Sequence, residues 1–260
     1  MALQEHTLAL VSLAWARALG LPDDGLGTLG GPVAPGGPGP GRRVEFVLGA
    51  EDVLPGDGPH VATVLRLGEA AVVAGPEWFV TACRDVDDEV LALESTLLRL
   101  GAAHGARSRG EHTLYYADEA PAVDPARSIA VSFDSAHALE VAALCPADDV
   151  TAAGLPEWDH TAALVPVFED GQGGPVACAA AGYDVLSGIV ARLGVLAVPH
   201  LRGKGLGVYA AAAAMESAWL DGLVPSARVP EGHTAAHHTA VAVGMEPVGT
   251  QTSIGWDPAA

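Results

Sequence analysis

The chain has 260 residues, half of them hydrophobic, so it can bury a substantial core in one large domain or two small ones. Its formal charge of −19 disfavours nucleic acid and anionic membranes as partners and favours cationic ones, although acidic usage of this kind also serves solubility alone. Three widely spaced cysteines without CxxC spacing argue against a disulfide framework or structural zinc site and favour a cytoplasmic protein.

The first predicted region, residues 1–41, consists of a helix and a linker. Apolar residues recur at helical spacing up to Gly20, and Glu5 and His6 stand where a secretory signal would carry basic residues. Gly and Pro then dominate residues 22–41, which predicts a linker or a long surface loop. No apolar run approaches the ~20 residues that cross a bilayer, so we expect no membrane partner.

The second region, residues 42–125, is predicted to be a small α/β domain. Four runs have strand composition: 44–48, 61–67, 70–74 and 78–83. A helix is expected over 86–100 with Val90, Leu93, Leu97 and Leu100 on one face, and the proline-containing stretch 117–127 is a connection. The region carries no chemical motif. Three roles stay open for it: a degenerate second copy of the next domain, a lid over a substrate, or the surface of a homodimer.

The third region, residues 126–260, alternates strand and helix patterns. The expected strands are 128–133, 161–168, 176–181, 189–198, 223–229 and 245–254, with a hairpin turn at 169–174. The expected helices are 136–144, 148–155, 206–220 and 234–243. The predicted order is therefore βα(α)βββαβαβ.

A glycine-rich bend joins the strand that ends at Val198 to the helix that begins near Leu206. Glycines at positions 203, 205 and 207 leave backbone amides uncovered, and a helix N-terminus attracts anions, so a diphosphate would fit there. Lys204 is the only lysine of the chain. A P-loop is disfavoured because Lys204 is followed by Gly205 and not by a serine or threonine whose hydroxyl could bind magnesium. A dinucleotide-binding fold is disfavoured because the glycines have GxGxG spacing and stand late in the chain.

The run Leu193-Gly194-Val195-Leu196-Ala197-Val198-Pro199-His200-Leu201-Arg202-Gly203-Lys204-Gly205-Leu206-Gly207 resembles the acyl-CoA-binding motif of the GNAT N-acetyltransferase superfamily. Ala242–Gly249 is similar to the closing segment of that family, and the resemblance covers about residues 128–256. It implies an α/β (α+β) fold with a mixed, mostly antiparallel sheet flanked by helices, preceded here by the smaller α/β segment.

The resemblance also implies a cofactor, a reaction and a set of cofactor-binding residues. The cofactor would be acetyl-CoA or another acyl-CoA, and the reaction direct attack of a primary amine, most simply a small molecule, on the thioester. The pantetheine arm would pair with the strand and the diphosphate would meet the amides of the bend. The implied residues are Val195, Leu196, Ala197, Val198, Arg202, Gly203, Lys204, Gly205, Leu206, Gly207 and Val208.

The chain departs from the family where proton transfer is expected. Leu193 and Gly194 replace a frequent carboxylate, and Ala240 replaces a frequent tyrosine. His233 and His237, four residues apart on one helix face, are our candidates for general base and acid because histidine titrates near neutrality. Alternatives are surface or capping histidines, an ordered water as proton relay, and a metal bound together with His238, although no carboxylate accompanies them at helical spacing.

The segment before the central hairpin would form part of the acceptor site. Glu157, Trp158 and Asp159, preceded by Asp148 and Asp149, offer carboxylates beside an aromatic ring, a combination that suits an ammonium group. Equally, the aspartates would suit a solvated helix start and Trp158 a packing role. Since the usual catalytic residues are missing, a catalytically silent acyl-CoA-binding module for regulation or assembly remains the alternative function.

Overall fold

The computed structural model describes residues 3–27, 43–48, 60–68, 70–121, 128–167 and 176–257. Contacts divide the chain into two compact units. Unit 1 comprises Tyr116–Ala227 and Ala235–Glu246; unit 2 comprises Ala2–Tyr115, Arg228–Thr234 and Pro247–Ala260. Residues 3–27 and 247–257 thus both belong to unit 2, and the predicted sequential domain ranges stay a prediction.

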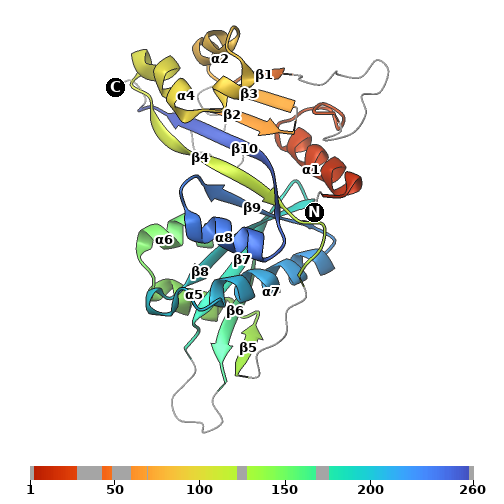
Figure 1. Ribbon diagram of the computed structural model, residues 1–260, viewed down its shortest axis with the longest axis vertical. Coiled ribbons are helices and arrows are strands. Elements are labelled where there is room, and N and C mark those ends of the chain that lie inside the picture. The colour runs from red at the N-terminus through yellow and green to blue at the C-terminus, as the bar shows by residue number, and fades with distance from the viewer. Residues whose placement is uncertain are drawn as a thin grey trace. The chain divides into compact units, whose positions relative to one another are not determined.

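Unit 1 contains a mixed, mostly antiparallel sheet, which confirms the predicted fold class (Figure 1). Its strands lie in the order β9 (Val224–Pro230, of which residues 224–227 belong to unit 1), β8 (Val190–Ala197), β7 (Ala179–Leu186), β6 (His160–Pro166) and β5 (Ile129–Ser132). Neighbours from β5 to β8 are antiparallel, and only β8 and β9 are parallel. A parallel pair inside an antiparallel sheet requires a crossover, and the crossover is a helix.

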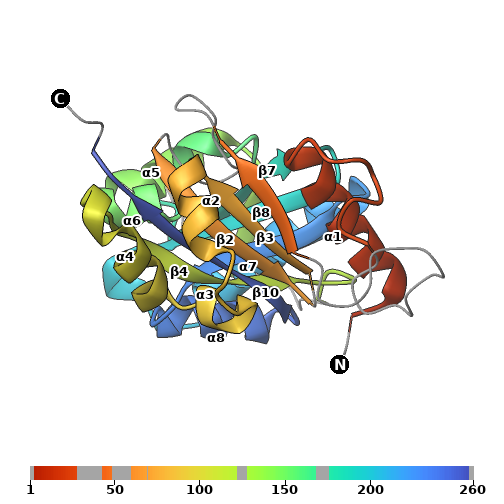
Figure 2. The same ribbon diagram turned by 90° about the horizontal axis from the view of Figure 1, so that it is seen from above.

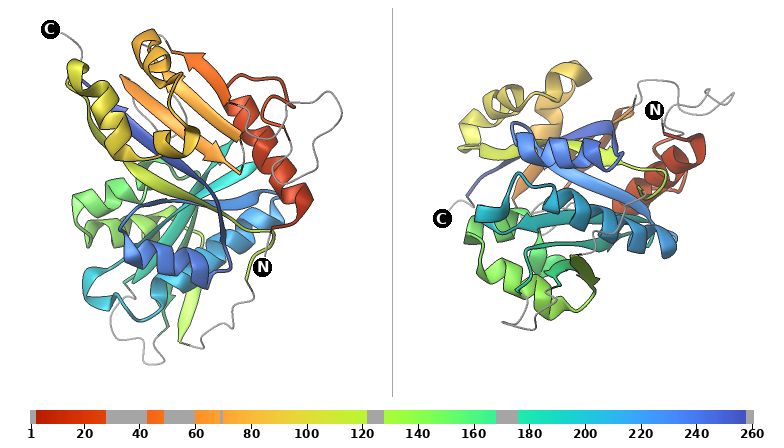
Figure 3. Two further views of the ribbon diagram at one scale, coloured as in Figure 1. Left: turned by 45° about the horizontal axis from the view of Figure 1, so that its top comes forward. Right: turned by 60° about the horizontal axis from the view of Figure 1, so that its bottom comes forward.

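Helices cover both faces of this sheet. The crossover helix α7 (Leu206–Leu220) packs on β6, β7 and β8, whereas α5 (Ser135–Ala143) packs on the same strands from the opposite face and α6 (Ala147–Ala152) packs on β8 (Figure 3). Short 3-10 helices η2 (Leu155–Glu157) and η3 (Pro199–Leu201) precede β6 and α7, and α8 (Thr234–Ala242) follows β9.

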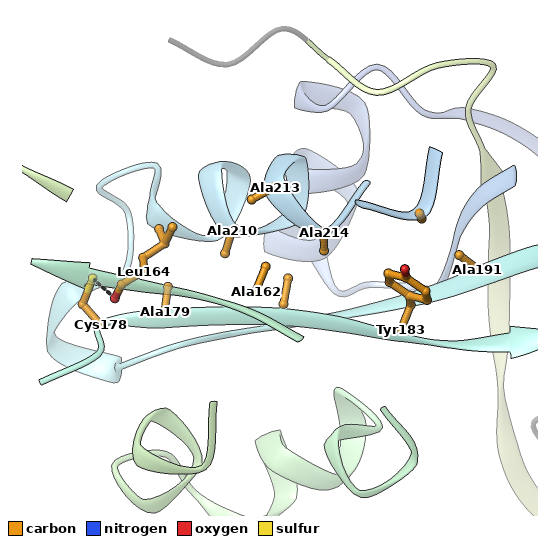
Figure 4. Close-up of a cluster of buried hydrophobic side chains, with 11 residues drawn as sticks. Ala162, Leu164, Cys178, Ala179, Tyr183, Ala191, Ala210, Ala213 and Ala214 are labelled. Carbon is orange, nitrogen blue, oxygen red and sulfur yellow. Dashed lines mark hydrogen bonds between the residues drawn. The ribbon is translucent and has the colours of Figure 1, made fainter. Parts of the chain in front are cut away.

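Alanines let α7 approach the sheet closely. Ala210, Ala213, Ala214 and Ala218 recur at helical spacing and face β6 and β7 in one buried cluster (Figure 4). Alanine also has the highest helix propensity, so the same residues favour the helix and its packing. The helix ends in a Schellman motif, in which Leu223 N–H donates to Ala218 O and Gly222 adopts a φ of 76°.

One polar group in this core ties a strand to the helix. Tyr183 of β7 is buried, its ring stacks on His160 at 4.6 Å, and its hydroxyl donates to Asp221 Oδ2 at 3.0 Å just past the end of α7. Burial raises the pKa of the Tyr183 hydroxyl, so it stays a proton donor at neutral pH. A buried hydroxyl with a partner holds the orientation of both elements.

Unit 2 is built around a second group of strands. Their order is β1 (Arg43–Val47), β3 (Ala70–Gly75), β2 (Val61–Leu67), β10 (Glu246–Gly255) and β4 (Arg107–Tyr116). The helices of this unit are α1 (Glu5–Ala18), α2 (Glu77–Cys83), α3 (Asp88–Leu91), α4 (Glu94–Gly101) and the 3-10 helix η1 (Ala102–His104). Helix α2 packs on β1 and β3 (Figure 2). Phe79 of this helix is fully buried.

Two sequence predictions in unit 2 are wrong. Residues 78–83 form helix α2 rather than a strand: Pro76 and Glu77 begin the helix, and Phe79, Val80 and Cys83 bury one helical face, which outweighs their strand propensity. The helix expected over 86–100 is broken at Ala92, whose carbonyl accepts from Thr252 at 2.6 Å. Val90 and Leu93, assigned to its apolar face, are exposed.

The other predicted elements agree with the structure within a few residues, except that β7 starts three residues later than expected and continues to Leu186. The element order predicted for the third region is confirmed. The predicted turn at 169–174 and residues 28–41 of the predicted linker lie outside the described residues. In the part of the chain that the structure describes, no helix combines the length and apolar character that a membrane span requires.

The three cysteines are free thiols and should differ sharply in reactivity. Burial raises the pKa of Cys83 to about 12, so at about pH 8 its thiolate fraction is on the order of one in ten thousand. We expect iodoacetamide to modify the half-buried Cys145 first, and Cys83 and Cys178 only after unfolding, as read by peptide mass spectrometry. Rapid modification of Cys83 in the native protein would contradict the described core of unit 2. The Cys145→Ser variant is the control, because the early modification should be absent from it.

Candidate functional site

The bend between β8 and α7 has both ends fixed and an open centre. Leu201 and Leu206 are partly buried against the core of unit 1, whereas Arg202, Gly203, Lys204 and Gly205 between them are exposed. Gly203 and Gly205 adopt φ values of 75° and 78°, a region that side chains other than glycine rarely enter. Glycine at these two positions is therefore required by the path of the backbone.

The described residues leave open space beside the two glycines of this bend. A Cβ atom added to Gly203 or Gly205 would meet no atom within 4 Å. Gly205 is the N-cap of α7 and supplies no side-chain hydrogen bond, so the amides of the first helical turn keep their donor capacity. Free amides at the positive end of a helix dipole are suited to bind an anion.

Next to the bend, β8 parts from β9. Their parallel pairing ends at Leu193 and Ala227, while β8 continues to Ala197 against β7. The hydroxyl of Ser226 in β9 donates a hydrogen bond to Ala191 O, so the main-chain carbonyl of Ala191 points toward β9. Because main-chain groups alternate in direction along a strand, those of Val195 and Ala197 point to the β9 side as well. Among the described residues Val195 has no strand partner on that side. This open edge could pair with an extended, amide-containing ligand.

The open edge and the bend adjoin each other. A Cβ added to Gly207 would lie 3.5 Å from Val195 Cγ1, which places the first turn of α7 beside the unpaired part of β8. Leu196 and Val198 face the opposite side of the sheet and are buried. Of the sequence-predicted cofactor residues, Val195 and Ala197 of the strand therefore lie on the same side as the bend 202–208, whereas Leu196 and Val198 do not; ligand binding there stays a prediction.

The side chain of Arg202 contacts two protein groups. Its Nη2 lies 2.6 Å from Asp149 Oδ2 of α6, and its Nε donates to Ala197 O at 3.1 Å. The hydrogen bond to Asp149 raises the pKa of the guanidinium above its ordinary value. Cys145 Sγ lies 3.6 Å from the same Ala197 O; burial raises the pKa of this thiol while Arg202 opposes the shift. Lys204 is exposed on the bend.

Trp158 packs on a pair of glycines in the sheet. Its Nε1 donates to Ala153 O at 3.0 Å, and its ring occupies the space where Gly182 and Gly194, directly opposite each other on β7 and β8, would carry side chains. Trp158 therefore connects the predicted acceptor segment to β8, the strand with predicted cofactor residues. Trp158 has a clear packing role, and Glu157 and Asp159 on either side of it are exposed.

The two candidate catalytic histidines occupy the start of α8. His233 is exposed directly before the helix, and its N–H donates to Pro230 O at 3.0 Å. His237 is half-buried one turn into the helix. Ala240, where the family often has tyrosine, is buried and supplies no proton donor. The catalytic role of the two histidines stays a prediction.

Sequence reasoning missed the ion pair of Arg202 with Asp149, because 53 positions separate the two residues. It also interpreted Gly194 only as a missing carboxylate, whereas the structure uses the absent side chain for Trp158. A signal for the second feature was present: a tryptophan followed by glycines in two successive strands is a pattern that close ring-to-backbone packing requires.

Neither a protein-family model nor a curated protein sequence matches the chain. Solved structures similar to it include a GCN5-related N-acetyltransferase from Kribbella flavida (19% identity, TM-score 0.43, covering 63% of this chain and 64% of that one). An acetyltransferase from the GNAT family of Colwellia psychrerythraea has 13% identity and a TM-score of 0.42, over 61% of this chain and 60% of that one. A GCN5-related N-acetyltransferase-like protein from Streptococcus suis has 14% identity and a TM-score of 0.44, over 77% and 85%.

This chain spans less than two thirds of the Kribbella and Colwellia proteins. Likeness at these identities assigns neither a substrate nor an activity to the chain, because function depends on the site and not on the fold.

The glycine pair under Trp158 yields a stability prediction. A Cβ at Gly194 would lie 1.8 Å from Ala153 O, a backbone atom that cannot move alone. Gly194→Ala should therefore lower the free energy of unfolding by at least about 2 kcal/mol in urea titrations. Gly207→Ala is the matched control, because its Cβ would meet only Val195 Cγ1 at an ordinary 3.5 Å and alanine favours a helix. Equal stability of the two variants would contradict the described packing.

Proposed function

We propose that the chain is an acyl-CoA-dependent N-acyltransferase, using acetyl-CoA in the simplest case, that acts on the primary amine of a small molecule. The observation that supports this most is the continuous surface made by the open edge of β8 and the uncovered amides of the bend before α7. Few ligands need both an extended amide-pairing edge and a diphosphate site, and coenzyme A carries a diphosphate joined to an extended chain with two amides.

The residues present fit such a ligand. Gly203 and Gly205 leave room for a diphosphate to approach the backbone, and Val195 offers main-chain groups to an amide of the arm. Bound acyl-CoA would supply an activated acyl thioester. The chain's part is then to orient the thioester and the amine, because a well-oriented attack needs no enzyme nucleophile.

Two proton transfers complete the reaction. An ammonium group of pKa ~10 must lose a proton before its nitrogen can attack the carbonyl carbon. As the new C–N bond forms and the C–S bond breaks, the departing sulfur must gain a proton. We assign these transfers to His237 and His233, since Leu193, Gly194 and Ala240 at the positions usual in the family cannot exchange protons.

The acceptor would enter beside η2. Glu157 and Asp159 flank Trp158 there and provide exposed carboxylates for an ammonium group. The charge of −19 favours a cationic acceptor and disfavours nucleic acid or an anionic membrane. Free thiols at all three cysteines suit a reducing cytoplasm.

A catalytically silent acyl-CoA-binding module is the second candidate. It is favoured by the apolar or small residues at positions 193, 194 and 240, and it requires the same cofactor surface. The two functions therefore agree on binding and differ in turnover.

Binding is tested by a charge placed in the bend. Gly205→Asp should weaken coenzyme A binding at least about tenfold more than Gly205→Asn in calorimetric titrations, since it adds a carboxylate where the diphosphate would lie. Both residues tolerate the positive φ of 78° better than other side chains do, so the pair isolates charge from backbone strain. Equal affinities of these two variants for coenzyme A would contradict a diphosphate site at the bend.

Turnover is tested by release of free coenzyme A thiol from acetyl-CoA in the presence of polyamines, amino acids or aminoglycosides. With an accepted amine, His237→Ala or His233→Ala should lower kcat by at least about tenfold while coenzyme A affinity is unchanged, because only proton transfer is removed. His238→Ala, exposed on the same helix, is the control. Binding without turnover on any amine would support the silent module instead.

A further inference from the structure

Asp149 and Arg202 make a contact that the proposed reaction does not itself require. Asp149 lies in the first turn of α6, and Arg202 begins the bend. Besides the ion pair at 2.6 Å, Arg202 Nε binds Ala197 O, the last carbonyl of β8. The guanidinium thus joins α6 and β8 to the start of the bend. Its Nε and Nη2 donors, which could otherwise bind a phosphate, contact protein acceptors instead.

The position of this contact matters because the bend is intrinsically flexible. Glycine gains more conformational freedom on release than any other residue, and two of the three residues between Arg202 and Leu206 are glycines. Leu206 packs against the core, whereas the exposed Arg202 is held by its two side-chain contacts, by the hydrogen bond from its N–H to Pro199 O at 3.3 Å and by the neighbouring Leu201. Removal of the polar contacts should free one end of the bend.

We propose that Asp149 is a positioning residue: it holds Arg202 against the end of β8, so that the bend from Arg202 to Gly205 is shaped for a diphosphate before the ligand arrives. The proposal rests on the proposed function. Arg202 then acts as a brace of the loop, and the amides of the bend are the ligands of the diphosphate. Affinity comes from the ordering of the loop in advance, which removes that cost from binding.

A simpler role for Asp149 predicts the opposite result. If the carboxylate only competes with a phosphate for Arg202, its removal frees a cation and deletes a negative charge near the anion, and binding becomes tighter. If Asp149 positions Arg202, its removal weakens binding despite the favourable change in charge. The sign of one measured difference therefore separates the two.

The test compares Asp149→Asn with Asp148→Asn in calorimetric titrations with coenzyme A. Asp148 is the matched control, because it is the exposed neighbour on the same helix turn and the change in charge is identical. We expect Asp149→Asn to weaken binding about two- to fivefold, the scale of an exposed ion pair, and Asp148→Asn to leave it unchanged or slightly tighter. Tighter binding in Asp149→Asn, or equal affinity in both variants, overturns the proposal.

Two further variants separate positioning from a general loss of structure. Asp149→Asn combined with Arg202→Gln should bind no more weakly than Arg202→Gln alone, because the two residues act through one contact. Asp149→Glu, which keeps the charge, should recover part of the affinity. Additive losses in the double variant, or no recovery with glutamate, would contradict a brace.

A measurement without ligand tests the contact of Asp149 with Arg202 separately from the proposed function. Hydrogen–deuterium exchange of a peptide covering Arg202–Val208 should be faster in Asp149→Asn than in Asp148→Asn, since the bend opens more often. Unchanged exchange overturns the brace, whatever coenzyme A does. Faster exchange in a protein whose wild type fails to bind coenzyme A supports the brace and rejects the proposed function.

Discussion

The parting of β8 from β9 is the constraint on which the rest of the site depends. Up to Leu193 and Ala227 the two strands satisfy each other's main-chain groups, and beyond that point β8 pairs only with β7 among the described strands. Backbone donors and acceptors in a protein need partners, so an unpaired edge at the end of a parallel pair calls for water or for a ligand that resembles a strand. The helix that starts immediately afterwards adds a second set of open donors.

Small residues make this arrangement compatible with a packed core. On one face, the alanines of α7 bring the helix close to the strands, which places its first turn beside Val195. On the other face, Gly182 and Gly194 make room for Trp158, whose indole N–H finds Ala153 O. The strand that offers the open edge is thus supported from both sides, and a rigid edge loses little entropy when it pairs with a ligand.

The elements of unit 1 could be predicted from the sequence because hydrophobic period, glycine stops and the alanine-rich helix agreed with one another. Predictions failed where tertiary packing overruled local preference: residues 78–83 are helical because their apolar side chains cover a sheet. The strand expected over 176–181 stops before Gly182, whereas β7 continues through this glycine, whose missing side chain leaves the space that Trp158 fills. The bend followed from its glycines, whereas the brace of Arg202 by Asp149 depends on a contact between distant segments that no local pattern contains.

The central claim is that backbone amides of the bend from Gly203 to Gly207 bind the diphosphate of coenzyme A. The most direct measurement is a titration of the ¹⁵N-labelled protein with coenzyme A, followed by amide chemical shifts in NMR spectra. The account predicts that the largest shifts fall on Gly203, Gly205 and Gly207, and that inorganic pyrophosphate moves the same resonances. Saturable binding that leaves these glycine amides unmoved would contradict it.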